Sequence, residues 1–185
     1  MDALDQLLPS HEFSDTVSVE SSAGAARGLR AAREVSAVEM PLSLMLLTAR
    51  AVPLMISRRR VILPRGALWD DLMRTAGFAA FEDAPGRPLL MGYIGQPWKP
   101  TGSGAPVRTR EEFLAWDEPG WAKVAAAFWA ESNGSGTRLI TETRIHLTDE
   151  SARRKFARYW RLVRFGSVLL RRDWLRAAKR RAERT

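Results

Sequence analysis

The chain has 185 residues, no cysteine and a formal net charge of +8. Without cysteine there are no disulfides, no thiolate chemistry and no cysteine-ligated zinc, and 45% apolar against 27% charged residues excludes a disordered chain. We expect one α+β domain over residues 1–185, with residues 1–11 as an N-terminal leader and residues 176–185 as a basic tail.

Neither a secretory signal nor a membrane-spanning helix is expected. Residues 1–9 carry Asp2 and Asp5 and lack a basic segment followed by a long apolar run. The most apolar stretch, residues 40–56, is interrupted by Arg50 and by two prolines, and it falls short of the roughly 20 apolar residues that a spanning helix needs. We therefore expect a soluble, cytoplasmic protein.

The chain opens with one predicted strand and two predicted helices. Apolar and polar side chains alternate over residues 13–19, which is typical of a strand. An Ala-rich helix is expected over residues 23–35, capped by Ser21 or Ser22. A second helix is expected to begin near Pro41 and to end before the next proline.

Strands separated by turns dominate the middle of the chain. Residues 61–64 form a short candidate strand, and residues 77–96 look like an antiparallel hairpin around a turn at residues 83–86. Residues 97–109 hold three prolines and two glycines, so we expect a loop there that covers an edge or an opening of the sheet.

A second hairpin is predicted more strongly. A turn at residues 118–120 separates residues 113–117 from residues 122–131, and the sequence Asn-Gly-Ser-Gly at residues 133–136 leads into a strand over residues 137–148. One face of that last strand is expected to point inward and the other to be solvated. The inward face would carry Leu139, Thr141, Thr143, Ile145 and Leu147, and the solvated face Ile140, Glu142, Arg144 and His146.

A long amphipathic helix ends the chain. Thr148 is a good N-cap, and the acids that follow it suit the positive end of a helix dipole. Apolar residues recur along one helical face, and a kink is expected near Gly166. That face carries Phe156, Trp160, Val163, Leu170, Trp174 and Ala178.

The run GSGTRLITETR at residues 134–144, followed by a helix that begins with Thr148 and Asp149, resembles the ending of SRPBCC-superfamily proteins. These are START-like and polyketide-cyclase-like helix-grip proteins, and the similarity in element order covers residues 12–182. The resemblance implies a curved antiparallel sheet wrapped around the last helix, with two short helices after the first strand. It also implies a cavity between sheet and helix for an apolar ligand.

The preferred functional hypothesis is therefore that the protein binds or carries a hydrophobic small molecule or lipid, without a cofactor or a metal. Bulky aromatic side chains on the last helix, facing small residues expected at Gly92, Ala125 and Ala127, either interlock as a solid core or leave a void. The candidate lining is Leu89, Met91, Tyr93, Val124, Ala126, Phe128, Thr141, Thr143, Phe156 and Trp160.

Enzymatic chemistry is the first alternative. Only two histidines exist, and neither His11 nor His146 lies where a triad or a metal centre would need it. Glu142 and Arg144 are weak catalytic candidates, because a solvated ion pair explains them equally well. If they point inward, they become the base and counter-ion of a cyclase-like or hydratase-like enzyme.

The second alternative concerns the charge of the last helix. Residues 149–185 contain 13 basic and 4 acidic side chains, which is more positive charge than solubility requires. A solvated face explains these residues, and so does contact with an anionic membrane or with nucleic acid, although sequence-specific reading of DNA is not expected. The basic face would carry Arg153, Arg154, Arg158, Arg161, Arg171, Arg172, Arg176, Arg180, Arg181 and Arg184.

Overall fold

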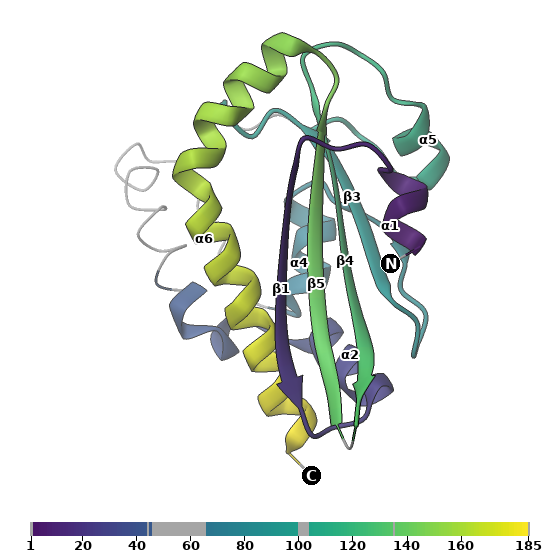
Figure 1. Cartoon of the computed structure of the whole chain (residues 1–185), viewed down its shortest axis with the longest axis vertical. Helices are drawn as coiled ribbons and strands as arrows, with labels where there is room; N and C mark the ends of the chain where they lie inside the picture. The colour runs from purple at the N-terminus through teal and green to yellow at the C-terminus, as the bar shows by residue number, and fades with distance from the viewer. Residues whose placement is uncertain (1, 44, 46–65, 100–103, 135, 185) are drawn as a thin grey trace.

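The computed structural model describes residues 2–43, 45, 66–99, 104–134 and 136–184. Its described part is an α+β fold in which a curved antiparallel sheet of five strands, ordered β1-β5-β4-β3-β2, is accompanied along its length by a long last helix (Figure 1). The strands are β1 (Phe13–Ser21), β2 (Ala79–Glu82), β3 (Leu89–Gly95), β4 (Ala122–Asn133) and β5 (Gly136–Leu147). This confirms the predicted fold class.

Helices cover both faces of the sheet. One face, here called the inner face, contacts α2, α4 and α6, and the opposite, outer face contacts α1 and α5. The helical elements are α1 (Asp2–Leu7), α2 (Ala25–Glu34), the 3-10 turn η1 (Ala37–Glu39), α4 (Leu68–Thr75), α5 (Arg110–Ala115) and α6 (Glu150–Glu183). No described helix is both long enough and apolar enough to cross a bilayer.

The pairing register decides which side chains face inward. Gly134, with a φ of 60°, turns the chain between β4 and β5, so that Phe128 pairs with Thr141 and Ala126 with Thr143. On the other side of β5, Thr141 pairs with Val17 of β1. Because side chains alternate along each strand, these residues all lie on the inner face. The prediction that Leu139, Thr141, Thr143, Ile145 and Leu147 face inward is therefore confirmed.

The outer face is filled, which corrects two expectations. Gly92, Ala125 and Ala127 do not face the last helix but lie on this face, where a Cβ on Gly92 would come within 2.4 Å of the Phe81 ring. The predicted leader is also part of this layer, because it forms α1 and buries Leu4 along with its neighbours Leu7 and Leu8.

The outer face of β5 is not solvated as predicted. Arg144 is 7% exposed and Glu142 13%, because α1 lies over them and Asp5 joins their ion pair at 2.6 Å from Arg144 Nη1. Ile140 is buried as well. A strand that alternates charged and apolar side chains can thus be covered on both faces when a helix elsewhere in the chain supplies the partners for its charges.

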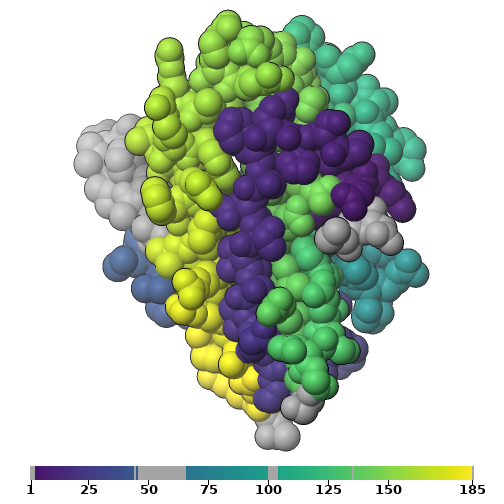
Figure 2. Space-filling model, in the orientation of Figure 1, coloured from purple at the N-terminus to yellow at the C-terminus, as the bar shows by residue number. Residues whose placement is uncertain are grey.

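The last helix begins one residue later than predicted. Asp149 is the N-cap and its side chain accepts the Ala152 N–H at 2.7 Å, whereas Thr148 exchanges hydrogen bonds with the Trp121 backbone. From there α6 runs 34 residues without interruption past Gly166. Figure 2 shows α6 beside β1 along the visible face of the molecule.

Three local predictions change in detail. Ser21 and Ser22 do not cap α2, whose N-cap is Gly24, but donate hydrogen bonds from their hydroxyls to Glu183 of α6. The segment before the turn at residues 118–120 is helical and forms α5. A helix does begin at Pro41, but its continuation and the candidate strand at residues 61–64 lie outside the described residues.

Candidate ligand cavity under the last helix

A cavity of about 660 Å³ lies between the inner face of the sheet and the first two thirds of α6. Strands β3, β4 and β5 supply one wall, α6 a second and α4 a third. Its lining is Leu72, Ala76, Phe78, Met91, Tyr93, Pro97, Val124, Ala126, Phe128, Thr141, Thr143, Ile145, Phe156, Tyr159, Trp160, Leu162, Val163, Gly166, Ser167, Leu170, Arg171 and Trp174. The interior is therefore not a solid core throughout.

Nine of the ten side chains predicted to line a ligand site do lie around this cavity. The tenth, Leu89, is 3% exposed and packs into the filled core beside α2, where it borders a separate surface hollow. The nine are Met91, Tyr93, Val124, Ala126, Phe128, Thr141, Thr143, Phe156 and Trp160. That they bind a ligand stays a prediction.

Aromatic rings dominate the α6 wall. The Phe156 and Trp160 rings stack with centroids 5.7 Å apart, and Phe13 of β1 approaches Phe156 at 5.1 Å. Further along the helix, Trp174 meets Phe128 of β4 at 4.6 Å. Such contacts fix the orientations of the rings, so that the rings are stabilised by one another although the cavity beside them is unfilled.

One tyrosine contributes a polar atom to the opposite wall. Tyr93 of β3 stacks on Phe78 with centroids 5.1 Å apart. Burial raises the pKa of the Tyr93 hydroxyl above its ordinary value, and the nearby Tyr159 adds to the rise. The hydroxyl therefore stays protonated at neutral pH.

Two polar side chains on the inner face, Thr141 and Arg171, contrast with these rings. The Thr141 hydroxyl is fully buried and has no hydrogen-bond partner among the described residues. Arg171 of α6 donates from Nη1 to the Asp15 backbone carbonyl at 2.7 Å, but its Nε and Nη2 atoms likewise have no hydrogen-bond partner there. Unsatisfied buried donors cost about 1–3 kcal/mol each, and both of these residues belong to the cavity lining, which makes them candidate partners for a polar group.

Arg171 keeps its charge in this setting. Burial lowers the pKa of its guanidinium, while the carboxylates of Asp15 and Glu142 act in the opposite direction. The ordinary value is so high that a lowered pKa still leaves the group protonated near pH 7. Arg171 was expected on the solvated face of the helix, and that prediction is wrong, because its side chain is 7% exposed.

The position of Arg171 can be traced in the sequence. It stands three residues before Trp174 and four after Ser167, and residues at those spacings share a helical face. Asp15 gives a matching signal, because it lies between Phe13 and Val17 on the inward face of β1. A charge within an apolar stripe on each of two elements that pack together predicts a buried pair.

The catalytic candidates Glu142 and Arg144 do not reach the cavity. Their side chains lie on the outer face, with Glu142 Oε1 2.6 Å from Arg144 Nε. Among the described residues no cluster of three potential metal ligands occurs. His146 lies 3.4 Å from Glu12, also away from the cavity lining.

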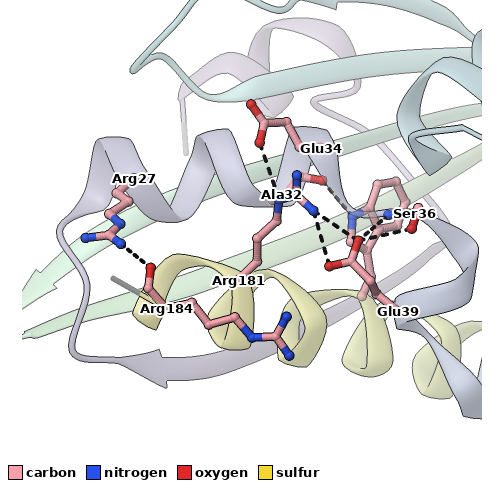
Figure 3. Close-up of polar contacts among 8 residues, drawn as sticks. Arg27, Ala32, Glu34, Ser36, Glu39, Arg181 and Arg184 are labelled. Atoms are coloured by element: carbon pink, nitrogen blue, oxygen red, sulfur yellow. Dashed lines mark hydrogen bonds and ion pairs between the residues drawn. The ribbon is translucent and has the colours of Figure 1, made fainter.

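Residues of the basic tail form ion pairs and hydrogen bonds with α2 and η1 (Figure 3). Arg181 lies 3.3 Å from both Glu34 and Glu39, and Arg180 donates to the Glu39 backbone carbonyl at 2.7 Å. Arg27 of α2 donates in turn to the backbone carbonyl of Arg184. These residues bind other parts of the chain, so the tail is less of an independent basic patch than its sequence predicts.

A different part of α6 is exposed and apolar. Leu162 is 83% and Phe165 80% exposed. Arg158, Arg161 and Arg172 are exposed on the same side of the helix. Leu162 also reaches the rim of the cavity.

Comparisons of the chain with protein-family models, with curated proteins and with solved structures find no match. Membership of the SRPBCC superfamily therefore stays a proposal that rests on the order of elements and on the residues quoted for it.

Proposed function

We propose that the protein binds, and in that way carries or sequesters, a hydrophobic small molecule or lipid in the cavity between the sheet and α6. The observation that supports this most is an unfilled space of about 660 Å³ whose walls are mostly aromatic and aliphatic. Pockets for small ligands are typically about 300–1,000 Å³ and largely apolar, with a few polar groups that fix orientation. A cytoplasmic site of action and membership of the SRPBCC superfamily belong to this proposal.

Displacement of a fluorescent probe tests it. N-phenyl-1-naphthylamine is neutral and apolar, and its emission rises when it leaves water. We expect saturable binding of one probe per chain and release of the probe when an alkanol is added. Native mass spectrometry of the purified protein is expected to show a co-purified lipid.

A matched pair of variants locates the probe. Val163 lines the cavity, so Val163→Trp fills space and should weaken probe binding at least tenfold. Lys155 is exposed on the same helix and away from the cavity, so Lys155→Trp should leave binding unchanged. Equal binding by both variants, or no binding by the wild type, would refute the proposal.

The exposed part of α6 favours a second candidate function, docking on an anionic membrane. Two apolar side chains, Leu162 and Phe165, project among arginines, which is the composition of helices that lie at a lipid surface. Each basic residue near such a surface contributes about 1 kcal/mol. Because Leu162 also borders the cavity, the docked face would bring the cavity rim close to lipid.

Vesicle flotation distinguishes this candidate from its alternatives. The double variant Leu162→Ser with Phe165→Ser should lose binding to vesicles that contain phosphatidylserine. The control, Arg180→Gln with Arg181→Gln, changes tail residues that pair with Glu39 and should retain binding. Binding to duplex DNA but not to vesicles would instead favour the nucleic-acid reading.

A further inference from the structure

A cavity for a purely apolar ligand has no need of the buried charged side chain of Arg171. Its side chain is 7% exposed and belongs to the cavity lining, as does the fully buried Thr141. A purely apolar ligand would leave the Arg171 donors and the Thr141 hydroxyl without partners, at a cost that increases when water is displaced. The ligand therefore needs a polar end.

The unsatisfied atoms of Arg171 define the chemistry of that end. Nε and Nη2 lie on one edge of the planar guanidinium, and this edge can hold both oxygens of a carboxylate through two parallel N–H···O bonds. The remaining nitrogen, Nη1, already donates to the Asp15 carbonyl and fixes the orientation of the group. Asp15 Oδ2 is 3.6 Å from Nη2, which is an ion-pair distance but too long for a hydrogen bond.

The local charge balance sets the charge of the ligand. Arg171 and Arg164 are both paired with the single carboxylate of Asp15, the latter at 3.5 Å. This group therefore has one net positive charge. A monoanionic head neutralises it, a neutral head leaves it uncompensated, and a dianion such as a phosphate monoester exceeds it. On the other face of the sheet, Arg144 pairs with both Glu142 and Asp5, and these three residues are not part of the cavity lining.

Resting on the proposed function, we propose that the ligand is an amphiphile with a single carboxylate head. The Nε and Nη2 atoms of Arg171 and the Thr141 hydroxyl donate to its oxygens, while its hydrocarbon part lies among the rings of Phe128, Phe156 and Trp160. A long-chain monocarboxylic acid has this chemistry.

Competition between two ligands of equal chain length tests the head group. Dodecanoate and dodecanol are each used, at pH 8 and below the concentrations at which they aggregate, to displace N-phenyl-1-naphthylamine from the wild-type protein. We expect dodecanoate to bind at least about tenfold more tightly than dodecanol, since hydrogen bonds to charged groups are the stronger class. Dodecyl phosphate should bind more weakly than dodecanoate.

Variants assign the preference to the residues. Arg171→Met removes the charge at similar volume and should abolish the preference for the acid, measured as the ratio of dodecanoate to dodecanol affinity within the same variant. Arg171→Lys keeps the charge but cannot form the two parallel hydrogen bonds, so it should retain only part of the preference for the acid. This variant keeps the test decisive if Arg171→Met fails to fold. Thr141→Val should weaken dodecanoate binding several-fold more than it weakens dodecanol binding, because the hydrogen bond to a charged oxygen is the stronger one.

Two results would overturn the inference and leave the proposed function in place. One is equal affinity of the acid and the alcohol for the wild type while the probe still binds. The other is an undiminished preference for the acid in Arg171→Met. If the wild type binds neither probe nor alkanol, the proposed function fails and the head-group inference fails with it.

Discussion

The two ends of α6 pack in opposite ways, although they belong to one unbroken helix. The C-terminal end presents small side chains, Ala177, Ala178 and Ala182, each at most 1% exposed, and it packs closely on α2. There Trp174 Nε1 also donates to the Ala32 carbonyl at 2.8 Å. The preceding part presents Phe156, Trp160 and other large side chains around empty space.

One helix thus packs closely at one end and borders an unfilled space along the rest of its length. Because alanine side chains are small, α2 and α6 pack closely together. Along the other part of α6, large aromatic side chains that contact one another keep the helix further from the sheet. We expect the alanine-rich end to determine the free energy of unfolding, and the ring-lined part to determine what the protein binds.

A pair of identical truncations should show the largest effect. Leu175 is 1% exposed in the filled core, so Leu175→Ala should lower the free energy of unfolding by about 2–5 kcal/mol. Leu170 is partly exposed and lines the cavity, so Leu170→Ala should cost about 1 kcal/mol or less, because it enlarges an existing space. Urea unfolding followed by circular dichroism measures both. Equal losses would contradict the comparison.

A pair of glycine substitutions should change stability in opposite directions. A Cβ on Gly28 of α2 would lie 2.5 Å from Leu139, a side chain that is 1% exposed and has little room to move. Overpacking there outweighs the gain in helix propensity, so Gly28→Ala should destabilise the protein by about 1 kcal/mol.

Gly166 is the matched case at the cavity. Nothing lies within 4 Å of a Cβ placed there, and Gly166 is inside α6. Gly166→Ala should therefore raise the free energy of unfolding by about 0.5–1 kcal/mol, the ordinary benefit of removing a glycine from a helix. Thermal melts of the two variants check the signs. A destabilised Gly166→Ala would mean that the cavity is filled at this point.

The smallest effect should come from pH. Burial by itself would raise the pKa of Glu39, but hydrogen bonds from Ser36 and the charge of Arg181 together lower it. The pKa of Glu183 is lowered as well, first by the Ser22 backbone N–H. Carboxylates with a depressed folded-state pKa contribute stability above their unfolded pKa and lose it as the pH falls through the folded value.

Acidification below about pH 4.5 should therefore loosen the attachment of the C-terminal end of α6 to α2 before the sheet unfolds. Hydrogen exchange of amides in residues 176–184 would show this. Glu39→Gln should flatten the acid dependence with a change in unfolding free energy under about 1 kcal/mol, and Glu118→Gln, at an exposed turn, is the control. An unchanged acid dependence in Glu39→Gln would count against an electrostatic attachment.

Much of the fold could be predicted because its signals are local. The glycine-rich turn at residues 133–136 and the alternation in residues 137–147 set the register of β4 and β5, and the register places the inward side chains. For that reason the predicted lining residues on these strands, such as Val124 and Thr143, do face the cavity.

What could not be predicted depends on contacts between distant segments. The solvated appearance of Glu142 and Arg144 was misleading, because the Asp5 that joins their pair lies some 140 residues away in the chain. The periodicity of α6 marks an apolar face, but it does not reveal where that face is filled by α2 and where it is open. Volumes come from three-dimensional packing and not from spacing.

The presence of Trp160 and Trp174 in the cavity lining has a practical consequence. Indole emission shifts with the polarity of its surroundings, so an occupant that replaces solvent beside these two rings should alter the intrinsic fluorescence of the unlabelled chain. Screening of compound collections can then proceed without a dye, and Trp160→Phe and Trp174→Phe would tell which ring responds.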